Sequence, residues 1–179
     1  IKFLFYYVMN VKKSKIELIH SDITAMEVDA IVNSTKESLL GGGGVDGSIN
    51  RAAGQELLKE CQTLGGCNTG HAKITNGYNL KAKFVIHTVG PIWRDGAKGE
   101  PQLLASCYRN CLQLAVENKI QNIAFPSIST GVYGYPILKA SQIAVREVKN
   151  FLVNNSLIKH VSFVCFSSED LYVYKSLLQ

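Results

Sequence analysis

Two glycine-rich segments, with an acidic residue inside the first, are the features of this sequence best suited to chemistry. Residues 40–47 read Leu-Gly-Gly-Gly-Gly-Val-Asp-Gly, and residues 129–136 read Ser-Thr-Gly-Val-Tyr-Gly-Tyr-Pro. Each segment follows an apolar run of strand length and precedes a helix-like stretch. Backbone N–H groups free of side chains, at the positive end of a helix dipole, favour a bound phosphate. Two such loops predict a ligand with two phosphates, and Asp46 places a carboxylate beside them.

The first loop matches the dinucleotide-binding pattern Gly-x-Gly-x-x-Gly, but its surroundings argue against that fold. The pattern requires an acidic residue about twenty residues further on, to hold a ribose hydroxyl, whereas residues 61–94 contain no Asp or Glu. A Walker loop is excluded because no Gly-Lys-Ser/Thr follows. Asp46 would repel a phosphate, so it should face a neutral part of the ligand or a water, which a carboxylate can orient or deprotonate. The local pattern alone equally allows Asp46 to be a helix N-cap.

The second loop follows Pro126, which ends another apolar run. Residues 129–134 supply backbone N–H groups, hydroxyls and two glycines, and a helix-like stretch starts at residue 137. This places the loop at the carboxyl end of a strand, where open α/β sheets bind ligands. Tyr133 and Tyr135 could stack on a sugar or base, or simply pack.

Three other candidate features carry weaker signals. Cys67 and His71 could suggest a metal site, but no further cysteine lies at zinc-finger spacing, so we predict no metal. His87 falls in an apolar run and is interpreted as a core histidine with satisfied hydrogen bonds. A Cys/His nucleophile pair is conceivable but has no sequence signature.

The loops are separated by alternating strand-like and helix-like segments. Apolar runs with little alternation predict strands buried on both faces, at residues 16–20, 29–32, 83–88, 120–125 and 161–166. Apolar residues at helical spacing predict longer helices, at residues 101–118, 137–153 and 169–178. A short helix capped by Asp46 or Ser48 should end near Gly54. The alternation predicts an α/β sheet with helices on both sides, to which the first two strands could add an antiparallel edge.

The composition is that of one globular domain over residues 1–179, with 46% hydrophobic and 18% charged residues. No apolar run approaches the length of a membrane helix, about 18 residues. The apolar start, residues 1–8, lacks a small-residue cleavage signature, so we expect a first strand rather than a signal peptide. Five scattered cysteines are interpreted as buried free thiols, which favour a cytoplasmic setting.

The net charge of +5 fits an anionic ligand, although a solvated surface with a small excess of lysine would also explain it. The basic residues form no run, which argues against a nucleic-acid-binding protein. A nucleic-acid-binding protein nevertheless remains the alternative to an enzyme or a small-ligand-binding module. It predicts an affinity for nucleic acid that falls steeply as the salt concentration rises.

Taken together, the motifs resemble the macrodomain family, and most of all its MacroD-type branch, which includes bacterial O-acetyl-ADP-ribose deacetylases. The resemblance runs in order along nearly the whole chain, through residues 22–24 (Asp-Ile-Thr), 29–33 (Asp-Ala-Ile-Val-Asn), 38–47, 51–54 (Arg-Ala-Ala-Gly), 69–72, 85–91 and 129–136. It implies a three-layer α/β/α sandwich around a mixed, about six-stranded sheet. It also implies a cleft for ADP-ribose across the strand ends.

The resemblance further implies a role for each matched position. Asp22 would accept a hydrogen bond from the adenine amino group, Phe166 would flank the adenine ring, and Tyr133 would cover the distal ribose. Asp46 would be the catalytic residue that orients or activates water. The implied ligand-binding residues are Asp22, Ile23, Asn33, Lys36, Gly43, Gly44, Val45, Ser129, Thr130, Gly131, Val132, Tyr133 and Phe166.

The implied reaction is hydrolysis at the distal ribose, without metal or cofactor. It removes ADP-ribose from modified carboxylate side chains of proteins, or acetate from O-acetyl-ADP-ribose. The expected partners are therefore ADP-ribose, O-acetyl-ADP-ribose and mono-ADP-ribosylated proteins, and we expect a monomer with no membrane association.

The chain departs from the family pattern beside Asp46. The hydrolases read Asn-Ala-Ala-Asn where this chain has Asn33-Ser34-Thr35-Lys36, and they usually carry His where it has Asn50. Lysine offers donors only, whereas asparagine offers a donor and an acceptor, and a cation could also pair with Asp46. Asn50 is expected to remove a polar neighbour of the site. Two functions therefore stay open: an active hydrolase, or an ADP-ribose-binding reader with weak or no hydrolysis.

Overall fold

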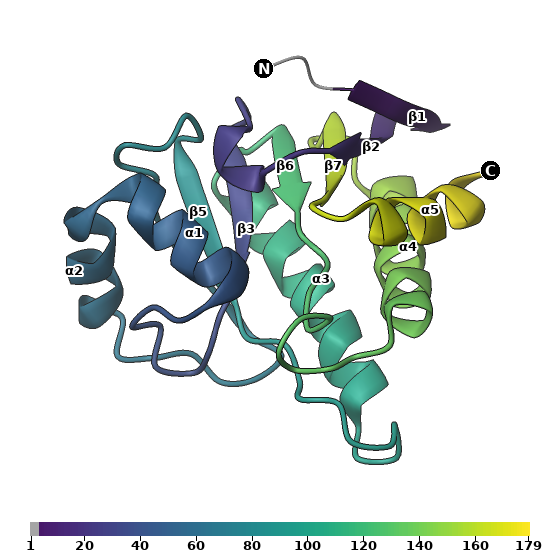
Figure 1. Cartoon of the computed structure of the whole chain (residues 1–179). Coiled ribbons are helices and arrows are strands. Elements are labelled where there is room, and N and C mark those ends of the chain that lie inside the picture. The colour runs from purple at the N-terminus through teal and green to yellow at the C-terminus, as the bar shows by residue number, and fades with distance from the viewer. Residues whose placement is uncertain (1–3) are drawn as a thin grey trace.

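The centre of the molecule is a mixed sheet of seven strands in the order β1-β2-β7-β6-β3-β5-β4. All of these strands except β4 are labelled in Figure 1. The structure, a computed structural model, describes residues 4–179. The four inner strand pairs are parallel, while β1 and β4 pair antiparallel at the two edges. The strands are β1 Leu4–Val11, β2 Ser14–His20, β3 Ala30–Ser34, β4 Ala72–Asn76, β5 Phe84–Thr88, β6 Asn122–Phe125 and β7 His160–Cys165.

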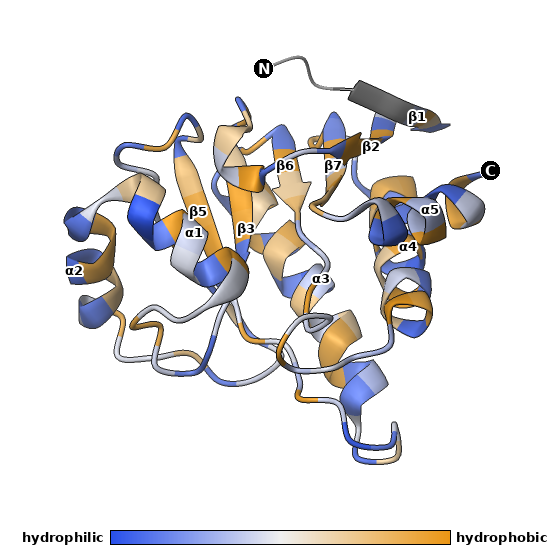
Figure 2. Ribbon diagram, viewed as in Figure 1, coloured by the Kyte–Doolittle hydropathy of each residue, from blue (hydrophilic) through white to orange (hydrophobic). Residues whose placement is uncertain are grey.

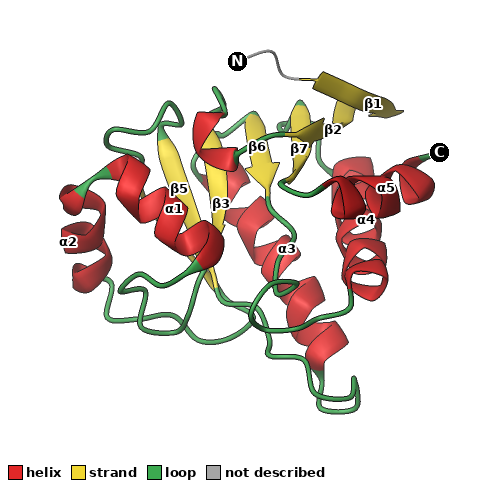
Figure 3. Ribbon diagram, in the orientation of Figure 1, coloured by secondary structure: helices red, strands yellow, loops and turns green. Residues whose placement is uncertain are grey.

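Helices cover both faces of the sheet (Figure 3). Helices α1 (Gly44–Ala53) and α2 (Gln55–Thr63) pack on one face, with the short 3-10 helix η1 (Ile23–Ala25). Helices α3 (Glu100–Glu117), α4 (Ile137–Asn154) and α5 (Ser168–Leu178) pack on the other. Successive residues of β3 face opposite cores: Ile31 faces α1 and α2, while its neighbours Ala30 and Val32 face α3 and α4. This two-sided burial explains the apolar runs of the inner strands (Figure 2).

The predicted α/β sandwich, its five strands and its three long helices are confirmed, with bounds that differ by two residues at most. The expected antiparallel edge is formed by β1 and β2. Of the first strand predicted over residues 1–8, residues 1–3 lie outside the described residues, and β1 continues to Val11.

The local structure differs from the sequence-based expectations at three places. The sheet has seven strands rather than about six, because β4 is an edge strand in which Thr75 alone is buried and no apolar run marks it. The second short helix, α2, was missed, although Leu57 and Cys61 stand at helical spacing on its buried side. The N-cap of α1 is Gly43, so Asp46 lies inside the first turn and Ser48 further along the helix.

The topology creates a crevice between β3 and β6. The chain leaves β3 toward α1 on one face, and it leaves β6 toward α4 on the opposite face. Loops that diverge in this way open a crevice at the carboxyl ends of neighbouring parallel strands. Both glycine loops lie there, because residues 35–43 follow β3 and residues 126–136 follow β6.

Candidate functional site

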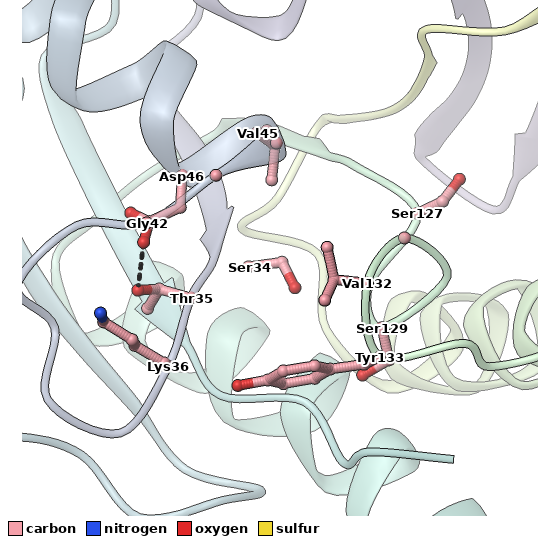
Figure 4. Close-up of a pocket in the computed structure, with 13 residues that line it drawn as sticks. Ser34, Thr35, Lys36, Gly42, Val45, Asp46, Ser127, Ser129, Val132 and Tyr133 are labelled. Atoms are coloured by element: carbon pink, nitrogen blue, oxygen red, sulfur yellow. Dashed lines mark hydrogen bonds between the residues drawn. The ribbon is translucent and has the colours of Figure 1, made fainter.

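The crevice holds two connected pockets. We call the first the aspartate pocket; it has a volume of about 340 Å³ and is lined by Ser34, Thr35, Lys36, Gly42, Gly43, Gly44, Val45, Asp46, Ser127, Ser129, Gly131, Val132 and Tyr133 (Figure 4). The second, the phenylalanine pocket, has a volume of about 430 Å³ and is lined by Ser21, Asp22, Ile23, Gly44, Val45, Ser48, Arg51, Pro126, Ser127, Thr130, Gly131, Val164, Phe166 and Asp170. They share Gly44, Val45, Ser127 and Gly131.

Two sets of free backbone N–H groups border the aspartate pocket. Helix α1 starts at Gly44 without a side-chain cap, and within residues 4–179 its first N–H groups, through Asp46, form no hydrogen bond. In the second loop, the N–H groups of Gly131, Val132 and Tyr133 likewise form no hydrogen bond within residues 4–179. Unpaired N–H groups at a helix N-terminus attract anions. The geometry therefore suits an anion held between the two loops.

Close packing against Gly90 and a backbone hydrogen bond from Trp93 fix the second loop. Ser129 is buried at φ +67°, and its hydroxyl lies so near Gly90 that a Cβ there would come within 2.0 Å of Oγ. The N–H of Trp93 donates to the carbonyl of Tyr133 at 2.8 Å. Gly90 is therefore required for close approach, and the Trp93 backbone ties down the end of the loop.

The carboxylate of Asp46 forms the floor of the aspartate pocket and is 4% exposed. Its Oδ1 accepts hydrogen bonds from Nδ2 of Asn33 at 2.9 Å and Nδ2 of Asn50 at 2.8 Å. Its Oδ2 accepts one from Oγ1 of Thr35 at 2.9 Å, the dashed contact in Figure 4. A carboxylate has about four acceptor positions, so these three donors fix its orientation and leave acceptor capacity for one more group.

A second layer of buried groups holds Asn33 in place. The other N–H of its amide donates to Nδ1 of His87 at 3.2 Å, since Nδ2 already donates to Asp46. The proton of His87 is therefore on Nε2, which lies 2.8 Å from Oγ1 of Thr75. Burial lowers the pKa of His87 from 6.5 to about 4, so the ring is neutral at pH 7. The expected core histidine is thus found in a chain of contacts that ends at Asp46.

Cys61, which lies next to His87, is not activated as a nucleophile. Sγ of Cys61 lies 3.7 Å from Nε2 of His87, but burial, with Asp46 and Glu60 nearby, raises the pKa of this thiol to about 11. The Cys/His pair therefore lacks the thiolate that a nucleophile requires. Within residues 4–179, no three His, Cys, Asp or Glu side chains gather closely enough to hold a metal ion. No helix in that range is long and apolar enough to cross a membrane.

The phenylalanine pocket contains a carboxylate with one oxygen free to accept hydrogen bonds, and an exposed aromatic ring. Oδ1 of Asp22 caps η1 by accepting from the N–H and hydroxyl of Thr24 at 2.9 and 2.8 Å. Its Oδ2 has no partner among the described residues. Ile23 is buried at the pocket wall, and the side chain of Phe166 is 80% exposed. An acceptor and an aromatic face in one pocket suit a planar ring with N–H donors.

The two departures from the family pattern differ in how they relate to Asp46. Asn50 donates to both the carboxylate and the backbone carbonyl of Asp46, so the expectation that it removes a polar neighbour was wrong. Asparagine reaches the carboxylate one helical turn away, since the pair is i, i+4 on α1. Lys36 is exposed at the pocket wall and forms no ion pair with Asp46 in the described part of the chain.

The structure brings thirteen of the fourteen predicted site residues to the walls of the two pockets. Asn33 is the exception; it lies behind Asp46, 1% exposed. Sequence reasoning missed Thr35, which supports Asp46, and Arg51, which lines the phenylalanine pocket within the Arg-Ala-Ala-Gly motif. Thr35 carried a signal, because it follows a predicted strand on the same side as Asn33.

Comparison with known proteins agrees with this geometry. A family model described as Macro domain matches residues 32–144. A macro domain-containing protein of Chlorobaculum tepidum is 59% identical over 163 residues, 91% of this chain and 95% of that protein. A protein of Salmonella newport named O-acetyl-ADP-ribose deacetylase is 53% identical over 169 residues, 92% of this chain and 94% of that protein.

Solved structures also match over nearly the whole of this chain. The Oceanobacillus iheyensis macrodomain with ADP superposes with a TM-score of 0.93 at 43% identity, covering 98% of this chain and 95% of that one. The Trypanosoma brucei macrodomain in complex with ADP-ribose gives a TM-score of 0.87 at 43% identity, covering 92% and 69%.

Proposed function

This chain belongs to the macrodomain family, and on that premise we propose that it binds ADP-ribose in the crevice and hydrolyses ADP-ribose esters at the distal ribose. The substrates are mono-ADP-ribosylated Asp and Glu side chains of proteins, and O-acetyl-ADP-ribose. One observation carries the proposal: two sets of free N–H groups and a firmly held carboxylate border the same pocket.

The ligand would lie across both pockets. Adenine occupies the phenylalanine pocket, where Oδ2 of Asp22 accepts from its amino group and Phe166 stacks on the ring. The diphosphate lies between the N–H groups of residues 44–46 and those of residues 131–133. The distal ribose reaches the aspartate pocket beneath Tyr133. Each end of the ligand thus meets the chemistry that suits it.

In this pose Asp46 acts on a water molecule. Asp46 lines the aspartate pocket and keeps acceptor capacity beyond its three donors, so it can orient the water there and take up a proton. In the net reaction one water is consumed, the ester C–O bond breaks, and a carboxylate, a proton and ADP-ribose are released. The ammonium of Lys36 donates to a ribose oxygen or a phosphate oxygen, because it has no partner in the described part of the chain.

A second candidate, an ADP-ribose reader without hydrolysis, is favoured by the same lysine. An ammonium offers donors only, so Lys36 cannot accept the hydrogen bond that an asparagine could accept from a ribose hydroxyl or water. In the reader, ADP-ribose binds as described, but water is not positioned for attack.

The two candidates separate in one set of measurements. Calorimetry with ADP-ribose tests binding, and release of acetate or of ADP-ribose from a modified peptide tests turnover. We expect Asp46→Ala to lower turnover by at least about 100-fold. The matched control, Glu117→Ala, removes an exposed carboxylate on α3 and should leave turnover unchanged.

Each outcome decides between the candidates. Absence of ADP-ribose binding would refute both. Binding with turnover no higher than that of Asp46→Ala would leave the reader, and restored turnover in Lys36→Asn would identify the lysine as the cause. Turnover that survives Asp46→Ala would remove the role given to this carboxylate.

A further inference from the structure

A third cavity, which we call the rim groove, continues from the aspartate pocket. It has a volume of about 610 Å³ and shares Lys36 and Tyr133 with that pocket. The phenylalanine pocket instead joins through residues that include Val45 and Ser127, which lie at the opposite end of the aspartate pocket from Lys36 and Tyr133 (Figure 4). The aspartate pocket therefore lies between the other two. A ligand that enters from the phenylalanine pocket and extends beyond the aspartate pocket reaches the rim groove.

Three cations line this groove without partners. Lys36, Arg94 and Lys98 are exposed, and their charged groups form no ion pair or hydrogen bond anywhere in residues 4–179. Elsewhere on the surface, unlike charges pair: Lys81 with Glu27, and Lys83 with Asp29. The cations of the groove are therefore available to an anionic partner.

The acidic residues of the groove do not offset these cations by direct pairing. Oε1 of Glu37 accepts hydrogen bonds from the N–H and hydroxyl of Thr69 at 3.2 and 2.8 Å. Glu100 is 2% exposed and accepts from the N–H groups of Arg94, Gly96 and Lys98 at 3.1, 3.2 and 2.7 Å. Burial opposes ionisation of Glu100, but these backbone donors lower its pKa to about 2. Glu100 thus folds the loop that presents Arg94 and Lys98, and its carboxylate is turned inward.

We propose that the rim groove binds an acidic segment of the substrate protein, next to the side chain that carries ADP-ribose. The inference rests on the proposed function, because the modified side chain must leave the distal ribose on the side of Lys36 and Tyr133. Its basis is charge complementarity: Arg94 and Lys98, which the proposed ADP-ribose pose does not use and which have no side-chain partner in residues 4–179, match the carboxylates of Asp or Glu residues that flank the modification. Such complementarity acts mainly on association rate and on the choice between substrates.

Two mono-ADP-ribosylated peptides test this inference. Both carry the same modified glutamate, flanked in one by aspartates and in the other by asparagines. We expect the acidic peptide to be preferred, and the double variant R94Q/K98Q to reduce that preference by roughly three- to tenfold at low salt. The preference should also shrink at high salt, because exposed charges are screened. The readout is kcat/KM if the chain hydrolyses the peptides, and Kd if it only binds them.

The control variant is K13Q/K175Q, which removes the same net charge from exposed lysines outside the rim groove and the two pockets. It should retain the preference. R94Q/K98Q should retain its affinity for free ADP-ribose and its turnover of O-acetyl-ADP-ribose, neither of which reaches the groove.

The results distinguish failure of the inference from failure of the proposed function. Normal ADP-ribose binding with equal use of both peptides would overturn the inference alone, as would equal losses on both peptides in R94Q/K98Q. Loss of affinity for a single-stranded RNA without loss for the acidic peptide would assign the groove to nucleic acid and overturn it too. If ADP-ribose itself does not bind, the proposed function fails and the inference falls with it.

Discussion

The floor and the rim of the crevice are built in opposite ways. On the floor, Asp46 is 4% exposed and is held by three side-chain donors. On the rim, Val132 is 95% exposed, Phe166 is 80% exposed, and Lys36 has no partner among the described residues. Folding alone thus fixes the floor, whereas the rim gains its contacts only when a ligand arrives. Changes to the floor should therefore alter stability and turnover, and changes to the exposed apolar side chains of the rim should alter affinity alone.

The pH dependence of stability gives the largest expected effect and tests the floor. The pKa of His87 is 6.5 in the unfolded chain and about 4 in the folded protein, so the unfolded state binds more protons between these values. The free energy of unfolding should fall as pH drops from 6.5 to 4, by about 3 kcal/mol from this group. When the free energy of unfolding is measured by urea unfolding at several pH values in this range, it should change less steeply with pH in His87→Gln than in the wild type.

Exposed His71 provides the matched control for that measurement, and His71→Gln should keep the wild-type slope. Carboxylates also titrate below about pH 5, so the difference between the variants is the informative quantity. If the free energy of unfolding depends on pH equally steeply in His87→Gln and the wild type, burial of this ring does not cause the loss of stability in acid.

Asn33→Ala should give the next largest effect. It removes the donor shared by Asp46 and His87 and leaves two buried acceptors without it. We expect the free energy of unfolding to fall by about 1–3 kcal/mol, and kcat to fall by more than KM changes. Asn154→Ala, at an exposed asparagine whose side chain hydrogen-bonds only the carbonyl of Asn150 among residues 4–179, should stay within about 0.5 kcal/mol of the wild type. An unchanged kcat in Asn33→Ala would show that Asp46 does not need this support.

Phe166→Ala tests the rim and should have a smaller effect, confined to binding. Loss of one aromatic face from a stacked base costs about 1–3 kcal/mol, which predicts about tenfold weaker binding of ADP-ribose by calorimetry. Stability should not change, because the ring is 80% exposed. Tyr172→Ala removes an equally exposed ring outside the pockets and should change neither quantity. Destabilisation in Phe166→Ala would contradict the separation of rim from floor.

Val132→Ala should have the smallest effect. Its side chain is almost fully exposed at the wall of the aspartate pocket, so only methyl groups that a ligand covers are lost. We expect affinity for ADP-ribose to fall by less than about threefold, with kcat unchanged. A large fall in kcat would place Val132 in the positioning of the reacting ribose, and the rim would then share the role of the floor.

Local patterns in the sequence predicted much of the fold and of the crevice. Apolar runs located β2, β3, β5, β6 and β7, because inner strands of a parallel sheet are buried on both faces. The polar edge strand β4 and the short helix α2 were not predicted, because neither has an apolar run. The glycine loops were located from their own composition, because glycines between a strand and a helix mark a turn that exposes backbone N–H groups to an anion.

The sequence by itself determined which segments become strands, helices and anion-binding loops, because those choices depend on neighbours along the chain. Only the tertiary structure decided what surrounds Asp46. The parallel register of β3 and β5 places Asn33 beside His87, 54 residues away, and the turn between β3 and α1 brings Thr35 under the same carboxylate. Register depends on how whole strands pair and pack, so no local pattern could show that Asn33 supports Asp46 rather than lining the pocket.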